Sequence, residues 1–232
     1  MPSIIVLDTL SPDGLAMLDA AAASGISYEV STGLSGDALR ECLAQHDGAI
    51  CRSGVKIGAD CLVGNHRLKA IVRAGVGTDN IDKDAATRQG IVVMNTPAGN
   101  TVSTAEHAFA LLLGLSRNLA AADASLRNHR WDRNTFMGVQ VAGKTLGIVG
   151  MGRIGQALAK RARAFDMRVM GFDPFLSPER AAELGIELVP SVTSMLPQVD
   201  YLSVHTPLTN ETRHLIGMPE LEILKPGVRL IN

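Results

Sequence analysis

The stretch TLGIVGMGRIG, residues 145–155, decides the fold of the second half of this 232-residue chain. Its first five residues are an apolar run that predicts a buried strand, and the helical pattern of residues 156–165 follows its last glycine. Between them stands G-x-G-x-x-G. The first glycine permits a sharp bend, the second lets a pyrophosphate approach the backbone, and the third lets strand and helix pack closely, with the phosphates on the helix N-terminus. The spacing predicts a dinucleotide-binding turn, although three glycines could also serve only as a strand-to-helix connection.

An acidic residue follows where such a unit needs one. The next predicted strand, residues 168–172, ends at Asp173, close to the ~20 residues past the turn at which a ribose-binding carboxylate is expected. This carboxylate would accept bonds from the ribose hydroxyls and repel the additional phosphate of NADP, so we predict NAD as the cofactor. Asp173-Pro174 is also a common turn-forming pair. Arg153, on the first helical turn, is predicted either to contact the pyrophosphate or to be solvated.

Short β-branched runs alternate with helix-length stretches along the chain, a rhythm typical of parallel βαβ units. Strands are predicted at residues 4–7, 28–30, 49–51, 68–72 and 91–94, and again at 145–149, 168–172, 201–204 and 228–231. The breaker cluster NTPAGN, residues 95–100, separates the two series. We therefore predict an α/β fold with two doubly wound parallel-sheet domains, residues 1–98 and 99–232. One long helix is expected from Ser103 to Asn128, with Ser103 and Glu106 forming a capping box at its start.

Composition narrows the class of protein. Apolar residues make up 46% of the chain, the formal net charge is -1 and aromatic residues amount to 3%. With no basic stripe and few aromatic side chains for base stacking, nucleic acid is not expected as a partner. The three cysteines, Cys42, Cys51 and Cys61, lack CxxC spacing, so we predict neither a metal site nor a disulfide framework, and a reducing compartment fits. Because the N-terminus shows no signal-peptide pattern, we expect a cytoplasmic protein without a membrane partner.

Five segments together resemble the NAD-dependent D-2-hydroxyacid dehydrogenases, and they occur in the family's order along essentially the whole chain. The segments are RAGVGTDNID (73–82), FMG (136–138), GKTLGIVG (143–150), VHTP (204–207) and KPGV (225–228). The resemblance implies a flavodoxin-like substrate-binding domain followed by a NAD-binding Rossmann domain. It also implies hydride transfer between NAD and C2 of a D-2-hydroxy acid. The most similar branch implies conversion of 3-phosphoglycerate to 3-phosphohydroxypyruvate, the entry step of serine biosynthesis.

The resemblance assigns substrate binding mainly to the first domain. Arg52 and Arg73, each at the carboxyl end of a predicted strand, would lie near the substrate anions, although either could instead form a structural ion pair. The turn Gly75-Val76-Gly77, expected between a strand and a helix, would bind the substrate carboxylate through backbone N–H groups. Asn100 would lie close to the substrate, or act only as a turn residue.

The glycine turn and the resemblance together indicate the cofactor contacts. These are Val76, Gly150, Gly152, Arg153, Ile154, Gly155, Asp173, Thr206 and Pro207. Arg130 and Arg133 match a segment that can offer charge to a substrate phosphate across a dimer interface, but a solvated loop accounts for them nearly as well. A phosphorylated 2-hydroxy acid is the expected substrate, and a homodimer or homotetramer is the expected assembly.

The catalytic Arg, Glu and His of the family pattern fall beyond Asn232, so no catalytic residue is expected within this chain. Its six histidines, His205 included, are each expected to be structural or exposed. We therefore expect a fragment that lacks the C-terminal strands of the nucleotide-binding sheet, binds NAD weakly and has no dehydrogenase turnover. The alternatives are a glyoxylate or hydroxypyruvate reductase and, in a different class, a non-catalytic, corepressor-like NAD sensor.

Overall fold

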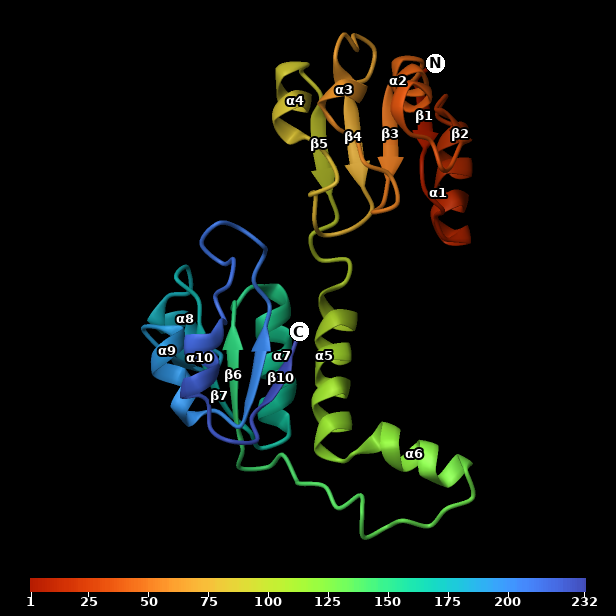
Figure 1. Cartoon of the computed structure of the whole chain (residues 1–232). Coiled ribbons are helices and arrows are strands. Elements are labelled where there is room, and N and C mark those ends of the chain that lie inside the picture. Colours follow the sequence, from red (N-terminus) through yellow and green to blue (C-terminus); the bar gives the residue numbers. More distant parts are fainter. The chain divides into compact units, whose positions relative to one another are not determined.

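The computed structural model describes all residues from 1 to 232, and the chain divides into two compact units, Met1–Asn100 and Thr101–Asn232 (Figure 1). In the first unit the sheet has the order β2-β1-β3-β4-β5, and every strand pair is parallel. Its strands are β1 (Ser3–Val6), β2 (Ser27–Val30), β3 (Gly48–Cys51), β4 (Ala70–Arg73) and β5 (Val92–Asn95). This is the flavodoxin-like order of doubly wound folds. The predicted fold class is therefore confirmed.

Short helices connect these strands. They are α1 (Pro12–Ala22), α2 (Gly36–Ala44), α3 (Ala59–Leu62) and α4 (Lys83–Arg88). Local chemistry fixes two of their starts, because the Ser11 hydroxyl accepts the Gly14 N–H and the Asp82 carboxylate accepts the Ala85 N–H, each satisfying an orphan donor of a first turn. The helices and the strands bury one apolar core in which Ile5, Leu39 and Ile71 are fully inaccessible. The core fixes where each strand ends, and so where the side chains that follow the strands lie.

The second unit has a parallel sheet of the order β10-β9-β6-β7-β8. Its strands are β6 (Thr145–Val149), β7 (Arg168–Phe172), β8 (Glu187–Leu188), β9 (Tyr201–Val204) and β10 (Arg229–Ile231). Counted within the unit, this is the 3-2-1-4-5 order of a Rossmann sheet, with β6 at the centre. The two-residue strand β8 was not predicted, because so short a segment carries no periodicity.

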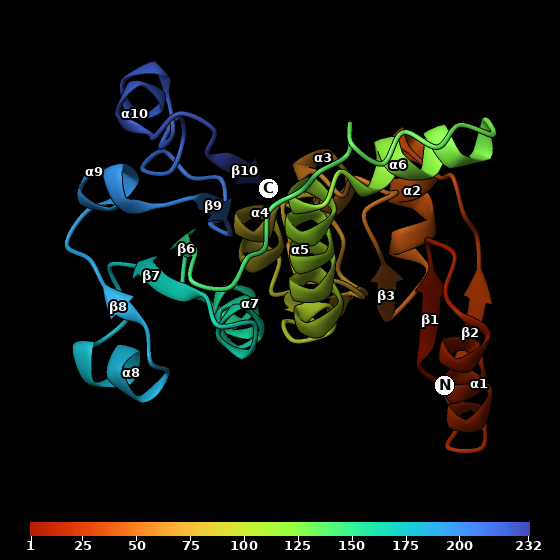
Figure 2. The same ribbon diagram turned by 90° about the horizontal axis from the view of Figure 1, so that it is seen from below.

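Helices cover both faces of the second sheet, as the views in Figures 1 and 2 show. They are α5 (Thr101–Ser116), α6 (Leu119–Arg127), α7 (Arg153–Ala164), α8 (Pro178–Glu183), α9 (Val192–Met195), the 3-10 turn η1 (Leu196–Gln198) and α10 (Met218–Ile223). Successive side chains of β6 enter opposite cores: Ile148 packs with α5 and α7, and Val149 packs with α9 and η1. A central strand apolar on both faces is what the run LGIV predicts.

The long helix predicted from Ser103 to Asn128 is wrong in two respects. The helical segment is broken, because Asn118 adopts a left-handed conformation with φ of 53° between α5 and α6. Asparagine tolerates that conformation better than most residues, and nothing in the apolar pattern marks the break. The capping box is also wrong, since α5 begins at Thr101 and Glu106 lies inside it, paired at 2.7 Å with Arg161 of α7.

A buried hydrogen bond joins α5 to the sheet. The Tyr201 hydroxyl of β9 lies 2.7 Å from the Ser116 hydroxyl, and both residues are at most 1% exposed. We expect Tyr201→Phe to lower the free energy of unfolding by about 0.5–1.5 kcal/mol, because Ser116 keeps its second bond, to the Leu112 carbonyl. Chemical denaturation of Tyr201→Phe, Ser116→Ala and the double variant checks this. Strictly additive effects would show that the two hydroxyls are not coupled.

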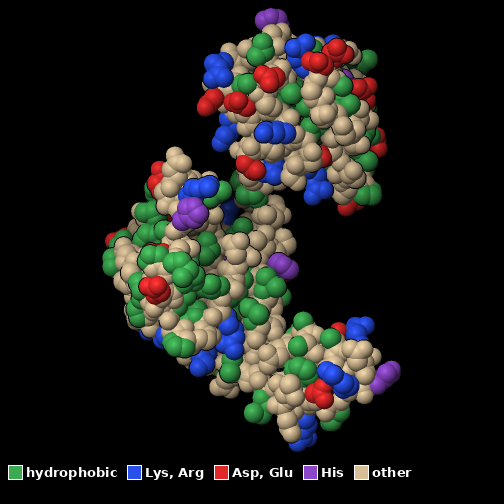
Figure 3. Space-filling view, in the orientation of Figure 1, with side chains coloured by type: hydrophobic (Ala, Val, Ile, Leu, Met, Phe, Trp, Pro, Cys, Tyr) green, Lys and Arg blue, Asp and Glu red, His purple; other side chains and the backbone are tan.

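No helix combines the length and the apolar character that crossing a membrane requires. On the face drawn in Figure 3, Lys and Arg side chains are interspersed with Asp and Glu rather than gathered into one basic stripe.

Candidate functional site: a dinucleotide-binding turn in the second unit

The glycine turn of residues 150–155 joins β6 to α7, and its first and last glycines are required by geometry. Gly150 has φ of 94°, and a Cβ there would lie 2.8 Å from the backbone carbonyl of His205. A Cβ on Gly155 would overlap the carbonyl oxygen of Gly150. The sharp bend and the close packing of strand against helix that the sequence predicted are both present. Substitution at either position would displace the turn.

Gly152 differs from these two glycines, because no atom lies within 4 Å of the place where its Cβ would project. It is the exposed N-cap residue of α7, a helix of 12 residues. Its φ of -67° suits any residue, so the protein itself does not demand glycine here. Open space in front of unpaired N–H groups at a helix start is a cradle that fits a pyrophosphate. The residues present therefore fit a dinucleotide.

Asp173 follows the end of β7 and lies directly beside the turn. One carboxylate oxygen accepts the Met151 N–H at 2.8 Å, and the other accepts the Phe175 N–H at 2.8 Å. The second bond is the turn-forming bond that Asp173-Pro174 predicts, and the first ties the carboxylate to the glycine turn. The turn-forming role of Asp173 is therefore present, and ribose binding stays a prediction, for which the half-buried side chain remains accessible.

A cavity of about 510 Å³ opens between the turn and the loop after β9. This volume lies within the ~300–1,000 Å³ range of small-molecule sites. Gly150, Gly152, Asp173, Thr206 and Pro207 line it, so the structure brings five of the predicted cofactor residues together. Sequence reasoning missed the other walls, which are Phe172, Pro174, Phe175, His205, Thr209, Glu211, Thr212 and Leu215. The one available signal was Phe175, a large aromatic directly after the acidic turn that is 94% exposed.

Three predicted contacts, Arg153, Ile154 and Gly155, lie on α7 outside that lining. Arg153 is the first residue of the helix and is exposed, with no hydrogen bond or ion pair holding its guanidinium. Ile154 packs instead against the apolar core under the turn. Arg153 is therefore free to reach an anion at the helix start, whereas Ile154 offers its backbone N–H.

His205 also lines the cavity, but it lacks the partner of a catalytic base. Its Nε2 lies 2.8 Å from the Ser203 hydroxyl, and no carboxylate contacts the ring. Burial lowers the pKa of the imidazole, so the ring is neutral at pH 7. A neutral ring without a carboxylate to orient it agrees with the sequence-based expectation that His205 is structural.

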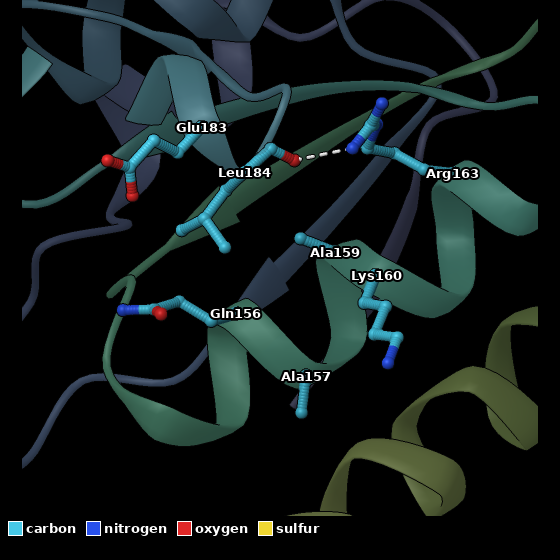
Figure 4. Close-up of a pocket in the computed structure, with 7 residues that line it drawn as sticks. All are labelled: Gln156, Ala157, Ala159, Lys160, Arg163, Glu183 and Leu184. Carbon is cyan, nitrogen blue, oxygen red and sulfur yellow. Dashed lines mark hydrogen bonds between the residues drawn. The ribbon is translucent and has the colours of Figure 1, made fainter. Parts of the chain in front are cut away.

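A separate cavity of about 340 Å³ lies along α7 (Figure 4). One of its polar side chains, Arg163, has a structural role, because it donates to the Leu184 carbonyl at 2.7 Å at the end of α8. None of the three glycines of the turn lines it. One lining residue, Gln156, contacts the turn by donating to the Met151 carbonyl at 2.8 Å.

In the first unit, Arg52 and Arg73 lie at the carboxyl ends of β3 and β4, and Arg73 pairs in register with Cys51. The Arg52 N–H donates to the Asp8 carboxylate, and the Asn80 amide donates to the Arg52 carbonyl at 2.7 Å. Arg73 is 12% exposed and lies 3.5 Å from an Asp79 oxygen, with its Nε buried and unpaired. Arg73 therefore makes the structural ion pair that the sequence left open, and it retains one unsatisfied donor.

The Gly75-Val76-Gly77 turn is not followed directly by a helix, since α4 begins only at Lys83. The turn does lie between a strand and a helix, as predicted, and further turns and a bridge stand between it and α4. The Gly75 N–H donates to the Arg73 carbonyl, so only the N–H groups of Val76 and Gly77 remain for an anion.

Three further predicted residues line neither of the two cavities described above. Asn100 is the exposed last residue of the first unit. In the second unit, Arg130 pairs with Asp132 at 3.1 Å, and Arg133 is exposed in the same segment. This agrees with the solvated-loop alternative for the two arginines, and substrate binding by them stays a prediction.

A parallel 3-2-1-4-5 sheet, an open glycine turn and a carboxylate at the end of the second strand define the second unit as a Rossmann dinucleotide-binding domain. Residues 109–232 match the family model described as D-isomer specific 2-hydroxyacid dehydrogenase, NAD binding domain. The chain belongs to this family, and its cofactor is NAD.

Individual relatives agree with the family. The chain is 45% identical over 234 residues to D-3-phosphoglycerate dehydrogenase of Mycobacterium bovis, covering all of this chain and 43% of that one. The TT0316 protein of Thermus thermophilus superimposes with a TM-score of 0.87 at 35% identity, over 98% of this chain and 72% of that one. A glyoxylate reductase from Paecilomyes thermophila gives 0.86 at 30% identity, over 99% and 72%. The chain spans less than half the length of the curated relatives it matches.

Proposed function

We propose that this chain supplies the substrate-binding and NAD-binding parts of an oxidoreductase that acts at C2 of a D-2-hydroxy acid, with 3-phosphoglycerate as that acid. The observation that carries the proposal is the Asp173 carboxylate bonded at 2.8 Å to the glycine turn, in a chain of this family. The substrate rests on the 45% identity to an enzyme named for it.

On the cofactor side, bound NAD would supply the hydride acceptor or donor. The open N-terminus of α7 and Gly152 would hold the pyrophosphate, with Arg153 as an additional charge. Asp173 would accept hydrogen bonds from the ribose hydroxyls and repel a 2′-phosphate. Thr206 and Pro207 would form the opposite wall of the cavity.

On the substrate side, the first unit would supply positive charge and backbone donors. The cationic side chains of Arg52 and Arg73 lie at the carboxyl ends of the neighbouring strands β3 and β4. A substrate with both a carboxylate and a phosphate uses such a cluster better than a singly charged acid. The N–H groups of Val76 and Gly77 would bind the carboxylate, and Asn100 would complete the substrate contacts.

The test of the substrate is a comparison of acids with the protein that contains this chain. We expect its kcat/KM for 3-phosphoglycerate to exceed that for D-glycerate by at least about tenfold, because the phosphate adds charge-assisted bonds. Steady-state NADH formation measures both values, with Arg52→Ala expected to reduce the ratio. The matched control is Arg67→Ala, which removes an arginine that pairs with Asp47 at another edge of the sheet.

The outcomes separate the alternatives. Equal use of both acids, or preference for glyoxylate, would contradict the phosphoglycerate proposal and favour the reductase named for one structural neighbour. NADH binding without turnover on any of these acids would favour the corepressor-like sensor.

A further inference from the structure

Three side chains with metal-binding atoms meet at the edge of the first sheet, in a cluster that the proposed function does not use. Glu29 comes from the edge strand β2, Cys42 from α2, and His46 follows the end of that helix. An imidazole nitrogen of His46, the Cys42 sulfur and a Glu29 carboxylate oxygen all lie within 4.8 Å of one another. The edge strand and the end of α2 therefore bring three different ligand atoms close together.

His46 has the orientation that a metal ligand needs. Its Nδ1 lies 2.8 Å from the Cys42 carbonyl oxygen, so in the neutral ring the proton sits on Nδ1 and the lone pair on Nε2. Nε2 lies 3.2 Å from a Glu29 oxygen. A carbonyl behind the imidazole is the arrangement that fixes ligating histidines, and the side chain is only 9% exposed. The ring is therefore preset rather than free to rotate.

The charges around the cluster suit a dication. Apart from its 3.2 Å contact with His46 Nε2, Glu29 has no basic side chain as a partner. The cluster also lies at the C-terminal end of α2, where the helix dipole favours positive charge. A thiolate and a carboxylate would together balance the two charges of the ion.

We propose that Glu29, Cys42 and His46 bind a borderline-soft divalent cation of the Zn²⁺ type, with water completing the coordination. Sulfur and imidazole ligands select against Mg²⁺ and Ca²⁺, which take oxygen. In a tetrahedral zinc site the ligand atoms are about 3.4–3.6 Å apart. His46 Nε2 and the Glu29 oxygen, 3.2 Å apart, already approach that spacing. The Cys42 sulfur, at most 4.8 Å from either atom, would have to move toward them by little more than about 1 Å.

Binding would release one proton. Burial, and secondly the Glu29 carboxylate, raise the pKa of the Cys42 thiol. The sulfur–metal bond forms as that proton passes to solvent.

Calorimetric titration of the chain with ZnCl₂ tests the site, with Co²⁺ as a spectroscopic probe. We expect one ion per chain, a Kd below about 10 µM, and a thiolate-to-cobalt charge-transfer band. Cys42→Ser should weaken Zn²⁺ binding at least about 100-fold and abolish the band, and Glu29→Gln should weaken it about 10-fold. The matched control is Cys61→Ser, which removes a thiol from the same unit and should change neither signal.

A measurement on the unaltered chain guards against a variant that fails to fold. Zn²⁺ should slow alkylation of Cys42 by iodoacetamide, with the modified residue identified by peptide mass. Unchanged alkylation, binding that survives Cys42→Ser in a folded variant, or no saturable uptake at 10 µM would each overturn the proposal.

Discussion

Replacing Asp173 by alanine is expected to weaken NADH binding by roughly 10- to 100-fold, the loss that follows when one charge-assisted hydrogen bond is removed. The carboxylate lies beside the glycine turn and is half-buried, so its bonds to a ribose would be only partly screened. The same change removes the repulsion of the 2′-phosphate of NADPH, so the ratio of the Kd for NADPH to the Kd for NADH should fall. Calorimetric titration of the 232-residue chain with each cofactor measures both effects.

Asp173→Asn separates charge from local structure. The amide oxygen can still accept the N–H of Met151 or of Phe175, so the turn is retained while the negative charge is lost. We expect NADPH binding to rise relative to NADH in this variant. If Asp173→Ala and Asp173→Asn both leave NADH affinity unchanged in folded protein, then Asp173 is only a turn former and the cofactor site lies elsewhere.

Gly152→Asp is expected to abolish measurable NADH binding, a loss of at least about 100-fold, without destabilising the protein. Aspartate is a favoured N-cap residue, and neither φ nor neighbouring atoms oppose a side chain at this position. Its carboxylate would occupy and repel the place where the pyrophosphate approaches the helix. Calorimetry measures the binding, and thermal unfolding measures stability, which we expect to stay within about 0.5 kcal/mol.

Gly155→Ala is the matched comparison within the same turn. Here the added Cβ overlaps the Gly150 carbonyl oxygen, so the free energy of unfolding should fall by about 1–3 kcal/mol. Gly152→Asp protein that is folded and still binds NADH with normal affinity would contradict the assignment of the turn to the pyrophosphate.

The strands could be predicted from sequence because short β-branched runs bounded by breaker residues strongly favour strands in a parallel sheet. All nine predicted strands are present, with ends displaced by at most two residues, and β6, β7 and β9 have the predicted bounds. The break between α5 and α6 could not be predicted, because it depends on one backbone conformation at Asn118 and not on the apolar pattern. The missed strand β8 exists only by pairing with β7.

Some residues of the candidate site could likewise be predicted from sequence, and others could not. The glycine turn and Asp173 could be predicted because their residue types and their spacing along the chain are typical of a dinucleotide-binding unit. The wall residues Thr212 and Leu215 reach the cavity through tertiary packing, which no local pattern reports. The expectation of no metal site considered cysteine spacing along the chain, whereas Glu29 and Cys42 meet only because β2 and α2 lie together at one edge of a sheet.

The order of the second sheet also constrains how this unit forms during synthesis. The central strand β6 pairs on one side with β7, which follows it after a single helix, and on the other with β9, where Leu146 faces Tyr201. At roughly 5–20 residues per second, the ribosome delivers β9 some seconds after β6. During that interval one apolar edge of β6 has no partner, which invites pairing with another chain. Refolding yield should therefore fall as protein concentration rises, and chaperone capture should be strongest for nascent chains halted between β7 and β9.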